Sequence, residues 1–120
     1  MSAIIDGSSD TFIADSTAGV VANRRVKLVT GRKLALAGAA EVEIGVTVLS
    51  VKKSDTQDLF KVQLRNAPGS SLVDAEDAFS LGAVVKRADL GKVAAGGAGA
   101  DYGIADGDGA ADGPVPVFPL

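Results

Sequence analysis

The chain has 120 residues, a formal net charge of −3 and a sequence pI near 4.8, a length that suits one domain. Because it contains no histidine and no cysteine, imidazole general bases, thiol nucleophiles, disulfides and most zinc sites are excluded. The acidic balance argues against nucleic acid as a partner. No apolar run reaches the ~18 residues of a membrane span, so we expect no membrane partner. An enzyme is not expected.

The N-terminal segment, residues 1–19, is rich in Ser, Asp, Thr and Gly. Two apolar pairs interrupt it, Ile4 with Ile5 and Phe12 with Ile13. The pattern predicts an extended arm that docks at a few points rather than folding back on its own domain. Residues 20–120 then form the folded domain, and deletion of residues 1–18 is expected to leave that fold intact.

The first half of the domain reads as two β-hairpins. Residues 25–30 alternate apolar and polar side chains, a Gly-containing turn follows, and residues 33–37 run back. Residues 44–51 form the longest β-branched run and precede a clean alternation at 59–65. Alternation on both sides of a polar turn is typical of antiparallel hairpins.

The second half carries weaker signals. Residues 74–80 are expected to form a single helical turn with Asp74 as its cap. Strands are predicted at 82–88 and 92–94, followed by a Gly-, Ala- and Asp-rich segment at 96–113. Pro114 and Pro116 lack the donors a ladder needs, so residues 114–118 are expected to be an edge strand or a docked tail.

These elements predict a mainly β protein. We expect a small single-domain β-barrel or sandwich of short antiparallel strands, with the extended arm and at most one short helix. The hairpin around residues 26–35 is echoed at 85–94, as a duplicated hairpin inside one small fold would be.

No catalytic, cofactor or metal-binding residues are expected. Residues 96–101 match the start of a calcium-binding nonapeptide, but no neighbouring repeat completes it. Asp106, Asp108 and Asp112 match the start of an EF-hand loop without its later ligands, so a solvated loop is the simpler interpretation. Whether the loop from Asp101 to Asp112 holds an ion stays open. The carboxylate pair Glu41 and Glu43 has no pocket signal beside it.

Charge is distributed unevenly along the chain. The cationic cluster comprises Arg24, Arg25, Lys27, Arg32 and Lys33, whereas residues 93–120 contain no lysine or arginine. Such asymmetry can orient subunits against one another or against a scaffold.

The order of elements resembles the small capsid decoration, or cement, proteins of tailed bacteriophages. The resemblance covers about residues 20–120. The segments that carry it are VKLVTG at 26–31, IGV at 44–46, SLGAVV at 80–85, DYGIA at 101–105 and the aliphatic end at 115–120. The prolines at 114, 116 and 119 and the charged turn at 52–58 depart from the family pattern.

The resemblance implies a non-enzymatic virion protein on the outer capsid surface. It would bridge neighbouring major capsid protein subunits, assemble as a homotrimer and stabilise the head against internal genome pressure. Ile4, Ile5, Phe12 and Ile13 would then contact the capsid, flanked by Arg24 and Arg25. A second interpretation is a β-barrel module that binds a polysaccharide or cell-surface polymer, which would need exposed aromatic platforms.

Overall fold

The computed structural model describes residues 9–14, 20–53, 58–65 and 69–119, and its regular elements are almost all strands. No helix in this part of the chain is long or apolar enough to cross a bilayer. The strands of the first unit are β1 (Ser9–Ala14), β2 (Arg25–Val29), β3 (Lys33–Leu36), β4 (Gly45–Lys53) and β5 (Asp58–Leu64). The second unit comprises β6 (Ser71–Asp74), β7 (Val84–Arg87), the 3₁₀ turn η1 (Asp89–Gly91), β8 (Val93–Ala94), β9 (Asp101–Ala105) and β10 (Pro114–Pro119). The predicted mainly β fold is confirmed.

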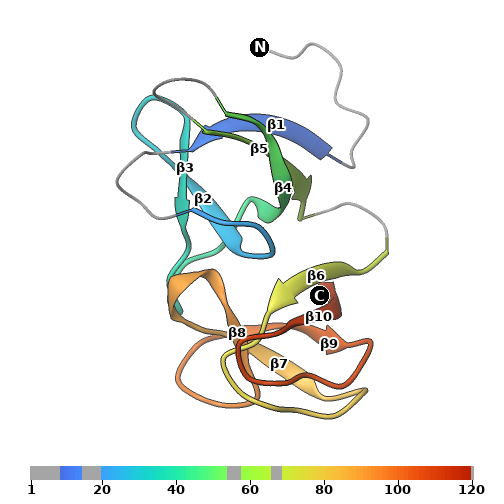
Figure 1. Cartoon of the computed structure of the whole chain (residues 1–120). Coiled ribbons are helices and arrows are strands. Elements are labelled where there is room, and N and C mark those ends of the chain that lie inside the picture. The colour runs from blue at the N-terminus through green and yellow to red at the C-terminus, as the bar shows by residue number, and fades with distance from the viewer. Residues whose placement is uncertain (1–8, 15–19, 54–57, 66–68, 120) are drawn as a thin grey trace.

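The first unit is a closed five-stranded barrel in the order β1-β3-β2-β4-β5 (Figure 1). The predicted hairpins are confirmed as β2 with β3 and β4 with β5. Alternate side chains point inward, and Phe12, Val26, Leu34, Phe60 and Val62 form its core. The β1–β3 pair is parallel, unlike the antiparallel pairing expected throughout.

The expected N-terminal arm is wrong for the residues of β1. This strand pairs with β5 on one side and β3 on the other, which closes the barrel. The Phe12 side chain is 8% exposed and packs inside. A strand forms here because its neighbours offer two unpaired edges and Phe12 gains burial between them. Deletion of residues 1–18 would therefore remove a barrel strand, whereas Ile4 and Ile5 lie outside the described residues.

The second unit is a five-stranded sheet in the order β6-β10-β9-β7-β8. It curls because an isolated parallel bridge joins Ala75, just after β6, to Val93 of β8 at the far edge. Its core contains Val73, Val85, Val115, Val117 and Tyr102. Strand β9 arises within the Gly-, Ala- and Asp-rich segment, where no strand was predicted.

The last strand is not an edge strand, contrary to expectation. Pro114 to Val117 of β10 pair with β6, and Val117 to Pro119 pair with β9. The prolines are tolerated because the ladder still uses carbonyl groups: Pro116 O accepts a hydrogen bond from Asp106 N–H. Proline removes a donor but leaves the acceptor.

The helical turn predicted at residues 74–80 is also wrong. Asp74 ends β6, and Phe79 exchanges two backbone hydrogen bonds with Gly109. The Phe79 ring lies in the core of the second unit. Burial of this aromatic side chain outweighs a local preference that is weak in so short a segment.

The two units pack closely at one end of the barrel. Val46 of β4 belongs to the core of the second sheet. Gly91 of η1 has φ of +71°, and a Cβ there would lie 2.5 Å from the Arg25 carbonyl oxygen. Its N–H donates to Ala37 O at 2.8 Å. Only glycine allows this close approach of the two backbones.

Candidate interaction surface

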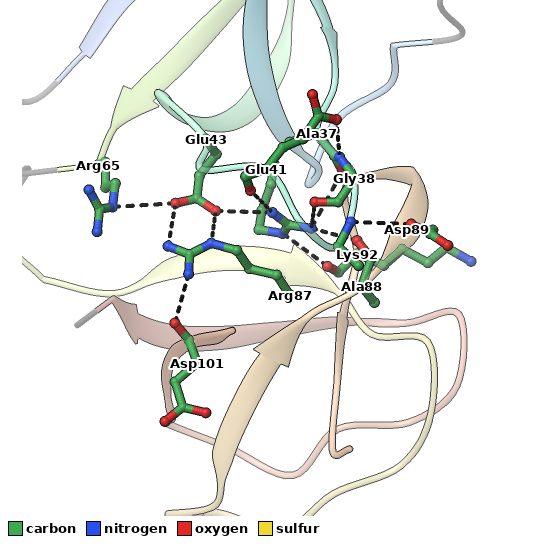
Figure 2. Close-up of polar contacts among 12 residues, drawn as sticks. Ala37, Gly38, Glu41, Glu43, Arg65, Arg87, Ala88, Asp89, Lys92 and Asp101 are labelled. Carbon is green, nitrogen blue, oxygen red and sulfur yellow. Dashed lines mark hydrogen bonds and ion pairs between the residues drawn. The ribbon is translucent and has the colours of Figure 1, made fainter. Parts of the chain in front are cut away.

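A buried cluster of charges joins the two units (Figure 2). The Glu43 carboxylate, from the β3–β4 connection, is fully buried. Arg25 Nη1 of β2 donates to Glu43 Oε1 at 3.0 Å, and Arg87 of β7 donates to the same carboxylate at 2.9 and 3.1 Å. Arg65 Nε, at the end of β5, lies 3.3 Å from Glu43 Oε2. One carboxylate thus pairs with guanidinium groups from both units.

The remaining donors of Arg25 are used by backbone carbonyl groups. Nε donates to Lys92 O at 3.0 Å, and Nη2 donates to the carbonyl oxygens of Ala37, Gly38 and Ala88. The carbonyls come from loops of both units, as Figure 2 shows. A buried guanidinium is tolerated only when its donors are satisfied in this way.

The surroundings of Glu43 keep its carboxylate ionised. Burial alone raises the pKa of the Glu43 carboxyl, but hydrogen bonds from Arg87 and Arg25 outweigh burial and hold that pKa below its ordinary value. Burial raises the pKa of the nearby Tyr102 phenol, which stays neutral. A general acid or base works best with a pKa near the operating pH. The pKa of Glu43 is instead lowered, away from neutral pH. We therefore assign the cluster a structural role.

The aspartates of the C-terminal loops are used for local contacts. Asp108 Oδ1 accepts a hydrogen bond from Leu81 N–H at 2.9 Å, and Asp112 Oδ1 lies 3.0 Å from Lys92 Nζ. Within the described ranges, no three or more acidic side chains gather closely enough to hold a metal ion.

An apolar row crosses the outer face of the second sheet. We call it the apolar stripe, and its members are Leu72, Pro116, Phe118, Ile104 and Val84. Leu72 of β6 lies opposite Pro116 of β10, Phe118 of β10 opposite Ile104 of β9, and Ile104 opposite Val84 of β7. Residues opposite one another in a ladder share a face with their Cβ atoms about 5 Å apart. The stripe therefore spans four adjacent strands.

Both faces of this sheet are apolar along the stripe. Leu72, Val84, Ile104 and Phe118 are 52, 47, 40 and 45% exposed, while the intervening Val73, Val85 and Val117 are fully buried. An antiparallel sheet with one face in water normally alternates apolar and polar side chains. A contiguous exposed apolar row on such a sheet is typical of an interaction site.

A hollow of about 260 Å³ lies at one end of the stripe, between barrel and sheet. Its lining residues are Asn23, Val46, Thr47, Val48, Gln63, Ser70 and Leu72. Leu72 belongs to both features. The hollow is smaller than the roughly 300–1,000 Å³ of pockets that enclose drug-sized ligands.

The residues expected to contact a capsid do not form one surface. Phe12 and Arg25 are buried, so a partner of the folded chain cannot reach them. Ile13 is half-buried in β1, and Arg24 Nε is paired with Asp74 Oδ2 at 2.7 Å. The prediction of a capsid contact is therefore wrong for Phe12 and Arg25, whose side chains lie in the interior.

Sequence reasoning missed the apolar stripe. The alternation of Val115 and Val117 with Pro116 and Phe118 signals two apolar faces on one strand, but not which other strands lie beside it. Glu43 was noticed only as one of a pair of carboxylates.

Comparison with protein families, curated proteins and solved structures gives no match to this chain. Function is therefore inferred from the fold and its surface.

Proposed function

We propose that this chain is a non-enzymatic structural protein of a virion, bound to the outer surface of a tailed-phage capsid. It would bridge neighbouring major capsid protein subunits and stabilise the head against internal genome pressure. The observation that carries the proposal is the apolar stripe, a ready-made binding surface on a rigid β scaffold. The resemblance of the sequence to capsid decoration proteins supplies the partner.

The physical case rests on burial and preorganisation. Full burial of an aliphatic or aromatic side chain contributes about 1.5–3 kcal/mol, and the stripe residues have roughly half of that area left to bury. The stripe residues lie on strands that are paired with one another in one sheet. Their backbone is therefore already ordered, and binding costs little conformational entropy. Such a surface suits a protein that adds stability to an assembly by binding its folded form.

We also propose that the protein associates with itself, as the homotrimer that the resemblance implies. Support comes from the uneven charge: residues 93–120 carry no lysine or arginine, whereas Lys33 and Lys61 lie on the barrel. The segment without basic residues in one copy would attract the lysines on the barrel of the next copy, as a head-to-tail ring requires. Sedimentation equilibrium of the free protein measures the oligomeric state directly, and a monomer at all concentrations would contradict this part.

The proposal is tested by sedimentation with expanded capsids of the protein's own source. Saturable binding at a fixed copy number per capsomer is expected. The double variant Ile104→Ser with Phe118→Ser should lose most of this binding while staying folded. No pelleting of folded wild-type protein would refute the capsid assignment.

A matched control uses apolar residues outside the stripe that are more exposed than Ile104 and Phe118. Leu81 and Leu90 are 65 and 61% exposed and belong to turns of the second unit. The double variant Leu81→Ser with Leu90→Ser should bind as the wild type does. Equal losses in both double variants would show that general surface apolarity, rather than the stripe, drives binding.

The polymer-binding alternative has less support. It needs aromatic platforms, yet Phe12, Phe60, Phe79 and Tyr102 are buried and Phe118 alone among the aromatic residues is exposed. Retention on a polysaccharide column together with no capsid binding would favour it.

A further inference from the structure

The outer edge of β6 has a break in its hydrogen bonds. β6 is the edge strand of the second sheet and lies next to the barrel strand β4 (Figure 1). Just before β6, Ser70 O accepts a hydrogen bond from Gln63 Nε2 at 3.3 Å. At the end of β6, Asp74 N–H donates to Asn23 O at 2.7 Å. Leu72 lies midway between them, and no hydrogen bond within the described part of the chain uses its N–H or C=O group.

The pairing with β10 shows which way these two groups point. Leu72 lies opposite Pro116, whose carbonyl oxygen accepts a hydrogen bond from Asp106 N–H at the end of β9. Because the N–H and C=O of one residue share a side of an antiparallel strand, Pro116 and Leu72 form a non-hydrogen-bonded pair. The Leu72 N–H and C=O therefore point away from β10, toward the gap between β6 and the barrel.

The hollow of about 260 Å³ lies in this gap. Leu72 lines it from the sheet, and Val46 and Val48 line it from β4. Val48 is the extra residue of a β-bulge, because β4 pairs with β5 through Thr47 and Leu49 on either side of it. Bulges often re-aim a side chain beside a binding site. The gap thus combines an apolar wall with a backbone donor and a backbone acceptor that the described residues leave unpaired.

We propose that this gap binds an extended peptide segment of a partner protein, which adds to the outer edge of β6. A residue of an extended chain presents its own N–H and C=O on one side, and these pair with the Leu72 C=O and N–H. An aliphatic side chain of the segment packs against Val46 and Val48. The volume of the hollow exceeds the roughly 150 Å³ of an apolar cavity that accepts benzene, so one such side chain fits in size.

The neighbouring contacts limit what can occupy this edge. The Asp74 N–H is already bonded to Asn23 O, so an added strand pairs with only one or two residues of β6. A folded sheet edge of a second copy is poorly suited, because its own barrel packs beside its β6 in the same way. A single extended segment has no such obstacle. The proposal goes beyond the proposed function, since it concerns the edge of β6 and does not require a capsid as the partner.

Amide hydrogen exchange of the full-length free protein, followed by NMR, tests whether the edge is open. The Leu72 amide should exchange on the order of a hundredfold faster than the amide of Val73. Val73 lies opposite Val115 and directs its N–H toward β10. Slow exchange at Leu72 would show that another part of the chain or a second copy already covers this edge, which would overturn the proposal.

A peptide titration tests binding. The probes are three blocked pentapeptides of threonine with valine, isoleucine or leucine at the centre, added at millimolar concentration. The amide signal of Leu72 and the methyl signals of Val46 and Val48 should shift with at least one of them. The control is the same peptide with an N-methylated central residue, which has no N–H to donate. It should bind about two- to tenfold more weakly, as expected for one lost hydrogen bond. Shifts with none of the peptides, or equal binding of the control, would contradict the proposal.

Two variants at one position separate the backbone of Leu72 from its side chain. Leu72→Ala keeps the N–H, whereas Leu72→Pro removes it. Both variants should fold, because proline is tolerated on an edge strand where its nitrogen faces away from the ladder. Leu72→Pro should bind the peptide about two- to tenfold more weakly than Leu72→Ala, and equal binding would refute the backbone pairing. If Leu72→Pro does not fold, the N-methylated peptide makes the same comparison. None of these measurements includes a capsid, so their outcome is independent of the capsid experiment.

Discussion

Arg87 and Glu43 form a bidentate ion pair across the boundary between the two units. Arg87 Nε donates to Glu43 Oε1 at 2.9 Å and Nη2 donates to Oε2 at 3.1 Å (Figure 2). Arg87 ends a strand of the second sheet, whereas Glu43 precedes the barrel strand β4. Because Arg25 shares the carboxylate, one glutamate links arginines of both units.

Replacement of Glu43 by glutamine should be strongly destabilising. It leaves Arg25 and Arg87 in contact with no negative charge between them, and breaking a buried ion pair in this way typically costs about 3–5 kcal/mol. Urea unfolding followed by circular dichroism measures the loss. Glu41→Gln is the matched control, because Glu41 forms a solvent-accessible pair with Lys27 and should cost far less. Equal losses would contradict the assigned role of Glu43.

Stability should also depend on pH through Glu43. Although burial raises its pKa, the arginine hydrogen bonds lower the pKa below its unfolded value. The stabilisation is then fully present above the unfolded pKa of about 4.3 and is lost as pH falls through the folded pKa. The free energy of unfolding of the wild type should thus fall more steeply below pH ~4 than that of Glu43→Gln. Parallel curves would exclude this linkage.

Replacement by alanine should affect mainly stability at Phe12 and mainly capsid binding at Phe118. Phe12→Ala removes a side chain from the barrel core, and such changes cost about 3–5 kcal/mol. Phe118→Ala removes a half-exposed ring of the apolar stripe, so it should cost much less stability while weakening capsid binding. Thermal melts and capsid sedimentation on both variants check this. A Phe118 variant with wild-type binding would remove Phe118 from the interface.

Truncation should separate the residues of β1 from those before them. Deletion of residues 1–8 leaves β1 intact and should give a folded protein with a cooperative thermal transition. Deletion of residues 1–14 exposes the paired edges of β3 and β5 and removes Phe12 from the core, so the barrel should not fold. Near-ultraviolet circular dichroism and amide exchange distinguish the outcomes; a cooperative fold in the longer deletion would contradict the strand assignment.

The glycine of η1 should tolerate alanine poorly. Gly91→Ala would place a Cβ within 2.5 Å of the Arg25 carbonyl oxygen at a left-handed φ. Gly82 is the control, because its φ is +85° but no atom lies within 4 Å of its added Cβ. Both variants carry the backbone strain of about 1–2 kcal/mol, and only Gly91→Ala also separates the two units. Equal melting temperatures would show that this contact is dispensable.

The strands that the sequence predicted correctly are those formed by local patterns. The hairpins β2–β3 and β4–β5 each combine alternating side chains with a nearby polar or glycine turn, and both partners lie within one short stretch of chain. β1 was missed because two apolar residues in a polar segment acquire strand character only between partners that lie 20 to 54 positions further along. β9 was missed because its glycine and alanine content resembles a loop.

Composition and local alternation determined the β class, the two hairpins and the absence of histidine and cysteine chemistry. Only the tertiary structure decided that Phe12 is interior, that Arg25 and Arg87 share Glu43, and that Leu72, Phe118, Ile104 and Val84 form one row. These relationships join residues far apart in the chain, and their register follows from how two cores close against each other. A pattern with a period of two residues predicts which side chains share a face of one strand, but strand order and stagger come from the packing of the whole chain.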